Sequence, residues 1–456
     1  MFRAGRCFSL LCLFGVLSCA TIFGSPLKAG AAKVDITPPT GLKMYGYAGR
    51  KSGATGVLDH LYARTLVLET DDKRLALVVL DLGRVFAPSW IEQLRAAVKQ
   101  SSGIDYVLVA ATHTHSGPDP TDQFPPPDQP DWATPILEKV EHAIDEAHQH
   151  AVEARLGTGY GVAYIGHNRL RNNPDGTASW FERNPTMVPT APVDPTLGIL
   201  RVDNSQGEPL AILVNYACHP VIFGSDNLQY SADWPGVMIK TVEKAFDGKP
   251  VVIFLQGGDG DINPYYAVTP LEQDAIAKRD WSGERVGNEA IRVARGISTR
   301  ADADASLQYV EDELPMKLRW DATKFRQAVL ESWGPGAAAE FDRQQKQPMN
   351  LPVTTLLINK RIALMTMPGE PFVEFQMDWR NRCPVPGAFF MGYTSADFDY
   401  FPTIRAATYG GYGSANTATR IELGAGDRMV DNALIRVYEF LGRLTDTPED
   451  LKRRGE

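Results

Sequence analysis

The stretch Val107-Leu108-Val109-Ala110-Ala111-Thr112-His113-Thr114-His115-Ser116-Gly117-Pro118 begins with five apolar residues and ends in two histidines, a glycine and a proline. A short apolar run bounded by turn-forming residues is typical of a fully buried strand. In open α/β sheets, ligands bind at the ends of such strands. We therefore expect a buried strand whose tip presents His113 and His115 to a functional site.

Four further apolar runs end on polar residues of the same kind. They are 213–217 before Cys218-His219-Pro220, 253–256 before Gly257-Gly258-Asp259-Gly260-Asp261, 363–367 before Pro368-Gly369-Glu370, and, more weakly, 79–80 before Asp81. Strand ends of parallel strands meet at one edge of a sheet. The repeated pattern predicts a metal-dependent active site at that edge.

The sequence predicts an α/β fold with mixed β-sheets flanked by α-helices. Strands are expected at 62–69, 74–81, 106–112, 196–202, 209–217, 250–256, 353–358 and 361–367. Helices are expected at 89–100, 135–151, 234–245, 283–298, 370–380 and 428–444. The strands at 62–69 and 74–81 follow each other without a helix, which indicates a hairpin and hence a mixed sheet. Residues 116–132, 167–195 and 393–427 are expected to be loops, and loops of such length are usually functional.

The composition is that of a globular protein that binds no nucleic acid. The chain has 456 residues, of which 44% are hydrophobic and 22% charged. Its net charge is -9, and no basic block interrupts the sequence. These features argue against a nucleic-acid partner and against an anionic membrane surface.

The N-terminus has the pattern of an export signal. Arg3 and Arg6 precede an apolar segment at 8–17, and the small residues Ser18-Cys19-Ala20 follow. Residues 1–20 are therefore predicted to be a signal peptide, too short for a membrane span, and residues 21–456 to be one exported catalytic domain. A lipid anchor at Cys19 is the alternative to release into the periplasm or the medium. No later stretch is long and apolar enough to cross a bilayer.

The cysteines predict no disulfide framework. Only Cys218 and Cys383 follow the signal segment. Two alternatives remain open: the two thiols pair in an oxidising compartment, or Cys218 is a small buried residue in the wall of the site.

The histidines supply the ligand types that a divalent metal needs. Zinc takes about three protein ligands from His, Cys, Asp and Glu and keeps one position open. His113 and His115 would point to the same face of an extended segment, so that both reach one metal, or one binds it while the other faces substrate. Glu370 is a candidate carboxylate ligand, and the alternative is an acid at a helix start. Residues 257–261 either cradle an oxyanion through backbone N–H groups or form an Asp-rich turn.

Five motifs together resemble the neutral/alkaline (non-lysosomal) ceramidase family. They occur in the family's order from Lys33 to about Arg420, which is nearly the whole mature chain. The motifs are Ala32-Lys33-Val34-Asp35-Ile36-Thr37-Pro38, Thr112-His113-Thr114-His115-Ser116-Gly117-Pro118, Asn215-Tyr216-Ala217-Cys218-His219-Pro220, Ser231-Ala232-Asp233-Trp234-Pro235-Gly236 and Gly260-Asp261-Ile262-Asn263-Pro264.

This resemblance implies a mononuclear zinc amidohydrolase that acts on lipid amides. The implied Zn²⁺ ligands are His113, His219, Glu370 and Tyr400. The groups that would stabilise the substrate carbonyl are His115, Arg169 and Tyr412. One departure is plain, because Asn263 occupies the position of the family's catalytic serine, and asparagine has no nucleophilic oxygen. The family's C-terminal β-sandwich is also expected to be absent.

The sequence thus predicts a secreted, zinc-dependent hydrolase of an amide (N-acyl) or ester bond that uses a metal-activated water. Asp261 or Asp259 would accept the proton, and Asn263 would position the substrate. One alternative is an acylated sugar or lactone as substrate, since flat aromatic rings suit sugars as well as acyl chains. The aromatic residues in or near the expected site loops are Trp180, Phe181, Trp234, Tyr265, Tyr266 and Trp281. The other alternative is a non-catalytic binding protein on the same scaffold.

Overall fold

The computed structural model describes residues 26–120, 130–302, 304–346 and 348–452. The predicted signal peptide, residues 1–20, lies outside these ranges, and so does the candidate anchor Cys19. Within the described ranges, none of the helices combines the length and the apolar character that a membrane span requires.

A bent eight-stranded sheet forms the larger part of the fold. Its order is β13 (Val251–Gln256), β11 (Pro209–Tyr216), β10 (Thr196–Asn204), β6 (Val152–Val162), β1 (Lys28–Asp35), β3 (Tyr62–Glu69), β4 (Arg74–Leu80) and β5 (Tyr106–Ala111). At its centre β1 and β6 pair through Lys28↔Glu153 and Ala29↔Val152, at one end of the strands. The sheet therefore opens into two four-stranded halves. The first half holds β1, β3, β4 and β5, and the second half holds β6, β10, β11 and β13.

A second sheet fills the space between the two halves. It has the order β15 (Leu307–Met316), β16 (Met349–Ile358), β17 (Ile362–Thr366) and β19 (Gly387–Met391). One buried cluster contains Leu66 of the first half, Leu213 of the second half and Leu364 of the small sheet. Three sheet pieces thus surround a common apolar core, and burial of this core is the main driving force of the fold.

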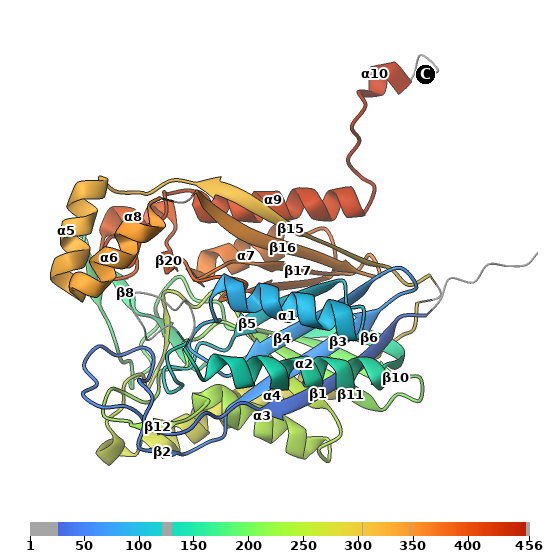
Figure 1. Cartoon of the computed structure of the whole chain (residues 1–456), viewed down its shortest axis with the longest axis horizontal. Helices are drawn as coiled ribbons and strands as arrows, with labels where there is room; N and C mark the ends of the chain where they lie inside the picture. Colours follow the sequence, from blue (N-terminus) through green and yellow to red (C-terminus); the bar gives the residue numbers. More distant parts are fainter. Residues whose placement is uncertain (1–25, 121–129, 303, 347, 453–456) are drawn as a thin grey trace, which may run out of the picture.

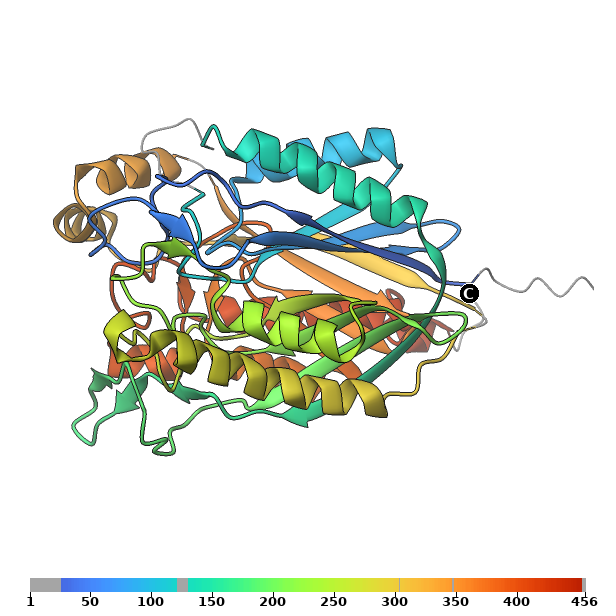
Figure 2. The same ribbon diagram turned by 90° about the horizontal axis from the view of Figure 1, so that it is seen from below.

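Helices cover the outer face of each sheet piece (Figures 1 and 2). The pairs are α1 (Pro88–Ser101) with α2 (Ala133–Gln149), α3 (Asp233–Ala245) with α4 (Ala275–Gly296), and α7 (Val373–Arg382) with α9 (Ala425–Phe440). The first pair packs on β1, β3, β4 and β5, the second on β10, β11 and β13, and the third on the small sheet. The predicted fold class, mixed sheets flanked by helices, is confirmed.

Each sheet piece contains one parallel pair of strands. The pairs are β4 with β5, β11 with β13, and β17 with β19. The segments that follow these strands gather at the end of the molecule that carries the short strands β2 (Gly56–Val57), β8 (Leu170–Asn172), β12 (Gln229–Tyr230) and β20 (Tyr400–Phe401) (Figure 1). The candidate residues therefore come together although they are far apart in sequence.

Several elements differ from the sequence prediction. The strands β1, β15 and β19 and the helices α5 (Ala322–Trp333), α6 (Pro335–Gln344) and α8 (Ile404–Tyr409) have no predicted counterpart, and the helix predicted at 283–298 begins at Ala275. The strand β6 is absent from the sequence prediction, because its residues Gly157, Gly159 and Gly161 break the apolar alternation. Those glycines allow α4 and the residue after it to pack closely against β6, since an added Cβ at each would lie within 3.0 Å of Ile297, Val293 or Glu289. The helix predicted at 370–380 begins later, at Val373. Glu370 lies in the short strand β18 (Glu370–Pro371), which excludes the helix-start alternative for this residue.

A buried carboxylate ties α7, which follows Glu370 in the chain, to the start of β10. Asp194 is 3% exposed and accepts hydrogen bonds from Arg380 Nη1 at 2.6 Å and from Gln376 Nε2 at 2.7 Å. Burial alone would raise the pKa of Asp194, but Arg380 outweighs it and holds the pKa below its usual value. This carboxylate therefore contributes stability above its unfolded pKa of about 3.9.

The replacement Asp194→Asn is expected to lower the free energy of unfolding by about 1.5–3 kcal/mol at pH 7, because hydrogen bonds to a charged group are lost. The difference from the parent should shrink as the pH falls below about 4, since the Asp194 carboxylate of the unfolded parent then binds a proton and the folded one still does not. Urea unfolding between pH 3 and 7 measures both. Asp378→Asn on the same helix is the matched control, because the Asp378–Arg382 pair is exposed, at 44% and 46%. Equal effects of the two replacements would contradict the assignment.

Candidate metal centre and active site

His113 stands just beyond β5 in a left-handed conformation, with φ 66°. Its Nδ1 lies 2.6 Å from the backbone carbonyl oxygen of Gly83, and its ring stacks on Tyr393 at 4.0 Å between centroids. A carbonyl oxygen can only accept, so Nδ1 carries a proton, and in the neutral ring Nε2 then presents a lone pair. The ring is fully buried. This turn therefore aims one basic nitrogen into the centre of the site.

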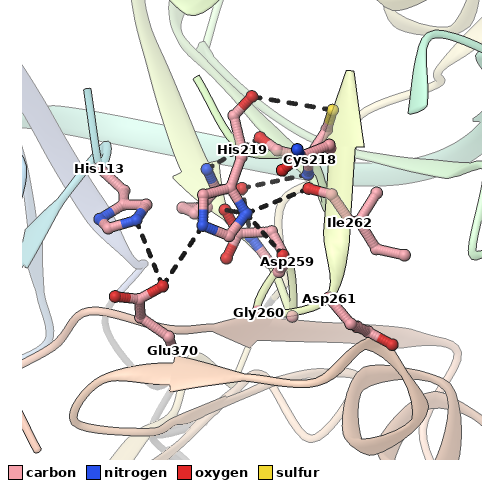
Figure 3. Close-up of polar contacts among 12 residues, drawn as sticks. His113, Cys218, His219, Asp259, Gly260, Asp261, Ile262 and Glu370 are labelled. Atoms are coloured by element: carbon pink, nitrogen blue, oxygen red, sulfur yellow. Dashed lines mark hydrogen bonds and ion pairs between the residues drawn. The ribbon is translucent and has the colours of Figure 1, made fainter. Parts of the chain in front are cut away.

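His219 follows β11 and has the same arrangement of its ring nitrogens (Figure 3). Its Nδ1 contacts the backbone oxygens of Asp259 at 2.7 Å and Ile262 at 3.1 Å. The indole Nε1 of Trp234 donates to the His219 backbone oxygen at 3.0 Å, which fixes the backbone from below. Its Nε2 faces Glu370 Oε2 at 3.3 Å and Arg169 Nη1 at 3.5 Å. A histidine whose Nδ1–H is held by a carbonyl and whose Nε2 faces the centre of a site is the usual metal-binding arrangement.

Glu370 places one carboxylate oxygen between the two imidazoles. Its Oε2 lies 3.5 Å from His113 Nε2 and 3.3 Å from His219 Nε2. Burial would raise the pKa of Glu370, but His113 and His219 outweigh it and hold the pKa well below its usual value. The strand β18 pairs with β20 so that Glu370 lies opposite Tyr400. Glu370 in turn raises the pKa of His113 above its usual value, whereas burial lowers that of His219. Two imidazole nitrogens, a carboxylate and a phenol therefore converge, and once the imidazoles have lost their Nε2 protons this donor set fits a zinc ion.

His115 completes a group of three imidazoles. Its Nε2 lies 3.1 Å from His113 Nε2, and His113, His115 and His219 offer ring nitrogens within 4.8 Å of one another. Burial, followed by the neighbouring histidines, lowers the pKa of His115 well below its usual value, so the ring is neutral. The rings of Tyr45 and Tyr47 pack edge-on against it at 5.3 Å and 5.2 Å. His115 is thus placed either to join the ligands or to face the substrate.

Arg169 brings a buried positive charge to the same centre. Its Nη2 donates to Tyr400 Oη at 2.9 Å and to the Gly260 oxygen at 2.7 Å, and its Nη1 donates to Asn263 Oδ1 at 3.2 Å. Burial would lower the pKa of Arg169, but Tyr400 and Glu370 raise it above its usual value, so the guanidinium stays charged. Asn263 also donates from Nδ2 to the Glu182 oxygen at 3.1 Å, so its amide is held at both ends.

Two half-exposed aromatic rings cover Arg169. Trp180 is 46% exposed and Tyr412 is 40% exposed. The guanidinium carbon lies 5.0 Å from the Trp180 ring centroid and 5.7 Å from that of Tyr412, and the two rings meet edge-on at 5.5 Å. The Tyr412 ring also packs against Tyr400 at 5.5 Å. The structure therefore brings Tyr412 to the site together with Arg169.

Neither aspartate suggested as proton acceptor points toward the imidazole Nε2 atoms at the centre of the site. Asp261 accepts from Asn168 Nδ2 at 2.6 Å and from the Val373 N–H at 2.9 Å, and Figure 3 shows its carboxylate turned away. It lines a separate pocket with Glu374 and Arg405. Burial raises the pKa of Asp261 to about 7.

Asp259 lies behind the ring of His219 rather than in front of it. Its Oδ2 is 3.4 Å from His219 Nδ1, on the ring edge opposite Nε2, and its Oδ1 accepts from Tyr393 Oη at 2.5 Å. Asp259 therefore supports His219, and the geometry favours neither aspartate as the acceptor of a proton from an attacking water.

Among the described residues, Trp180 is the only one of the suggested aromatic residues whose ring lies over Arg169. Trp234 is a core residue beneath His219, Phe181 and Tyr265 pack on His167, and Tyr266 packs on Trp281. Cys218 is fully buried in the apolar cluster under α3, and both described cysteines are free thiols. Burial raises the pKa of Cys218 well above its usual value, which agrees with a wall residue and not with a thiolate nucleophile.

Sequence reasoning missed several residues that shape the site, above all Tyr45, Tyr47, Gly83 and Asn168. Tyr45 and Tyr47 alternate with Gly46 in a loop, and Gly46 is needed there because an added Cβ would lie 2.2 Å from His115 Nδ1. The alternation of two tyrosines around a glycine was the available signal. Gly83 acts through its backbone oxygen, which no sequence pattern reveals.

Comparison with known proteins identifies the family. The family model described as "Neutral/alkaline non-lysosomal ceramidase, N-terminal" matches residues 27–274, which is more than half of the chain. The neutral ceramidase of Pseudomonas aeruginosa is 25% identical over 349 residues, covering 72% of this chain and 51% of that protein. The neutral ceramidase of Mycobacterium tuberculosis is 26% identical over 290 residues, covering 57% and 43%. The chain thus spans about half the length, or less, of the curated relatives it matches.

The fold agrees with that assignment. A crystal structure of neutral ceramidase from Pseudomonas aeruginosa superposes with a TM-score of 0.71 at 19% identity, covering 92% of this chain and 75% of that chain. A structure titled "Ceramidase complexed with C2" superposes with a TM-score of 0.70. The protein is a member of the neutral/alkaline non-lysosomal ceramidase family.

Proposed function

We propose that this chain is an exported, zinc-dependent hydrolase that cleaves the amide bond of an N-acylated substrate, with an acyl ester as a second accepted bond. The observation that carries the proposal is the position of Glu370 Oε2, 3.5 Å from His113 Nε2 and 3.3 Å from His219 Nε2. Both imidazoles are fixed through Nδ1 by backbone oxygens. A buried carboxylate facing two such nitrogens is the arrangement that a catalytic zinc requires.

His113, His219, Glu370 and Tyr400 would hold the ion. Bound there, Zn²⁺ would supply a Lewis acid for the substrate carbonyl and a lower pKa for a nearby water. His115 is assigned to the substrate side rather than to the ligands, because Glu370 already contacts both other imidazoles.

The nucleophile in this proposal is water, since Asn263 offers an amide in place of a hydroxyl. Water oxygen bonds to the carbonyl carbon, the C–N bond breaks, and the proton released by water ends on the leaving nitrogen. Arg169 and Tyr412 donate to the carbonyl oxygen as it becomes negative, and His115 offers a neutral imidazole on the other side. Asn263 holds Arg169 Nη1 and so sets the direction of the guanidinium.

The substrate class rests on two features. The relatives carry the name neutral ceramidase, which suggests a lipid amide, and the half-exposed rings of Trp180 and Tyr412 offer apolar surface beside the site. The same rings suit an acylated sugar. The proposal therefore commits to an N-acyl bond and leaves the amine portion of the substrate to experiment.

Removal of the metal is the test. Chelation is expected to lower the rate of hydrolysis of N-acyl substrates at least about 100-fold, and stoichiometric Zn²⁺ should restore that rate. The reason is that a bound ion stabilises the charge of the transition state by several kcal/mol. The panel should contain a ceramide, an N-acyl sugar, an acyl ester and a lactone. Activity that survives chelation, or a parent protein that binds zinc but hydrolyses none of these, would overturn the proposal and favour a binding protein.

A further inference from the structure

Two short helices stand apart from the main cores, next to the site. They are α5 (Ala322–Trp333) and α6 (Pro335–Gln344), at the end of the molecule that carries β8 and β20 (Figure 1). Phe325, Val329 and Phe341 form a small apolar cluster of their own. A unit with so small a core adds little to the stability of the three sheet pieces. Its contacts with the rest of the chain therefore indicate another role.

Those contacts are directed at the segment that carries Tyr412. We call residues 411–421 the Tyr412 loop. Trp333 Nε1 donates to Thr417 Oγ1 at 2.9 Å, and Trp320 Nε1 donates to the Thr419 oxygen at 2.5 Å. Arg319 Nη1 donates to the Ser414 oxygen at 2.5 Å.

The backbone just before α5 continues this attachment. The Arg319 N–H donates to the Arg420 oxygen at 2.8 Å, and Leu318 pairs with Ile421 as an isolated bridge. Ser414 and Thr419 are fully buried. Donors from α5 and the preceding segment thus reach acceptors spread along the Tyr412 loop.

The opposite side of the same loop lies on the site. An added Cβ at Gly413 would lie 3.1 Å from the Tyr400 ring, so the loop backbone rests directly on that side chain. The Tyr400 N–H donates to the Ala418 oxygen at 3.1 Å. Tyr412 itself is 40% exposed, and its ring contacts Arg169, Trp180 and Tyr400. The loop sets where the backbone of Tyr412 stands, and these ring contacts can form only from that position.

We propose that Arg319, Trp320 and Trp333 are positioning residues that hold the Tyr412 loop, and with it the Tyr412 hydroxyl, over the substrate carbonyl. The inference rests on the proposed function, because Tyr412 is given the role of a donor there. These three residues touch no reacting atom. They act through hydrogen bonds to the loop, and a donor displaced by about 1 Å loses much of its effect on the transition state.

The test compares Trp333→Phe, Thr417→Val and the double variant. Each single replacement removes the same hydrogen bond. Thr417→Val keeps the side-chain volume, whereas Trp333→Phe keeps an aromatic ring but makes it smaller. Each is expected to lower kcat roughly 3–10-fold, the effect of one hydrogen bond, with KM changed less than twofold. The double variant should be no worse than either single one, because both act through one contact. Gln327→Ala, on the exposed side of α5 and bonded within its own helix, is the matched control and should keep the parent kcat.

A second arm separates positioning from general damage. In a Tyr412→Phe background, Trp333→Phe should lower kcat less than twofold further, since the hydroxyl that it positions is gone. A full further loss in that background would overturn the proposal.

Hydrogen exchange makes the test independent of the proposed function. Amide exchange of residues 411–421 should rise at least about threefold in Trp333→Phe and Arg319→Ala, and exchange in β5 should stay as in the parent. Unchanged exchange in the loop would refute the attachment, whether or not the protein hydrolyses any substrate. Faster exchange with an unchanged kcat would show that the attachment holds the loop but does not position Tyr412 for catalysis. A parent without activity would refute the proposed function while the exchange result still decides the attachment.

Discussion

Glu370→Gln is expected to lower kcat/KM by roughly 10²–10⁴-fold and to lower zinc affinity with it. The replacement keeps the shape of the side chain but removes the negative charge that both Nε2 atoms face. Breaking a buried charge pair costs about 3–5 kcal/mol, and each 1.36 kcal/mol is a tenfold change in rate. Metal analysis after dialysis and kinetics on the best amide substrate of the panel measure the two effects.

Glu374→Gln is the matched control for this experiment. Glu374 lies in α7, where its Oε2 accepts a hydrogen bond from Thr403 Oγ1 at 3.1 Å. It lines the separate pocket beside Asp261. Its replacement should leave zinc content unchanged and activity within about twofold, as for other replacements away from the site. If Glu370→Gln still binds zinc like the parent while His115→Ala does not, the three imidazoles form the donor set and the proposed ligands are wrong.

Arg169→Met is expected to lower kcat by about 10²–10³-fold, the cost of removing one preorganised oxyanion donor. Zinc should still bind, since Arg169 is not a ligand and loss of a neighbouring positive charge does not oppose a cation. The replacement also frees Asn263 Oδ1 and Tyr400 Oη, which lose their donor. The kinetic signature is a fall in kcat with zinc content unchanged.

Arg171→Met provides the matched control, because Arg171 lies two residues further along the same hairpin. Its guanidinium carbon stacks on the Phe181 ring at 4.2 Å and the residue is exposed. This variant should keep kcat within about twofold of the parent. An equal loss in both variants would mean that the hairpin, and not the Arg169 donor, is responsible.

The sequence predicts the parts of the site that follow long buried strands. The apolar run before His113 predicts β5, and the run before His219 predicts β11, because periodicity and length identify such strands. Both histidines can therefore be placed at strand ends from the amino-acid pattern alone. Tyr400 and Arg169 enter only through resemblance to the family.

Short elements and turns are not predictable in this way. A two-residue strand has no periodicity, so the sequence pattern around Glu370 predicts a helix although this segment pairs with β20. The glycine-rich turn after β13 does not reveal which aspartate faces inward, because each glycine admits several backbone conformations. The strand β6 is hidden by glycines whose reason is the close approach of α4.

The division of the sheet has a consequence for assembly of the protein. His113 follows a strand of the first half, His219 a strand of the second half, and Glu370 a strand of the small sheet. A bound ion would therefore act as a tie between three separately wound pieces of chain. Since the proposed ligands meet only when all three pieces are docked, an ion would bind the finished fold and not its parts, and its binding energy would add to the cohesion of the whole. Under the proposed function, metal capture would then be a checkpoint on maturation as well as a condition for chemistry.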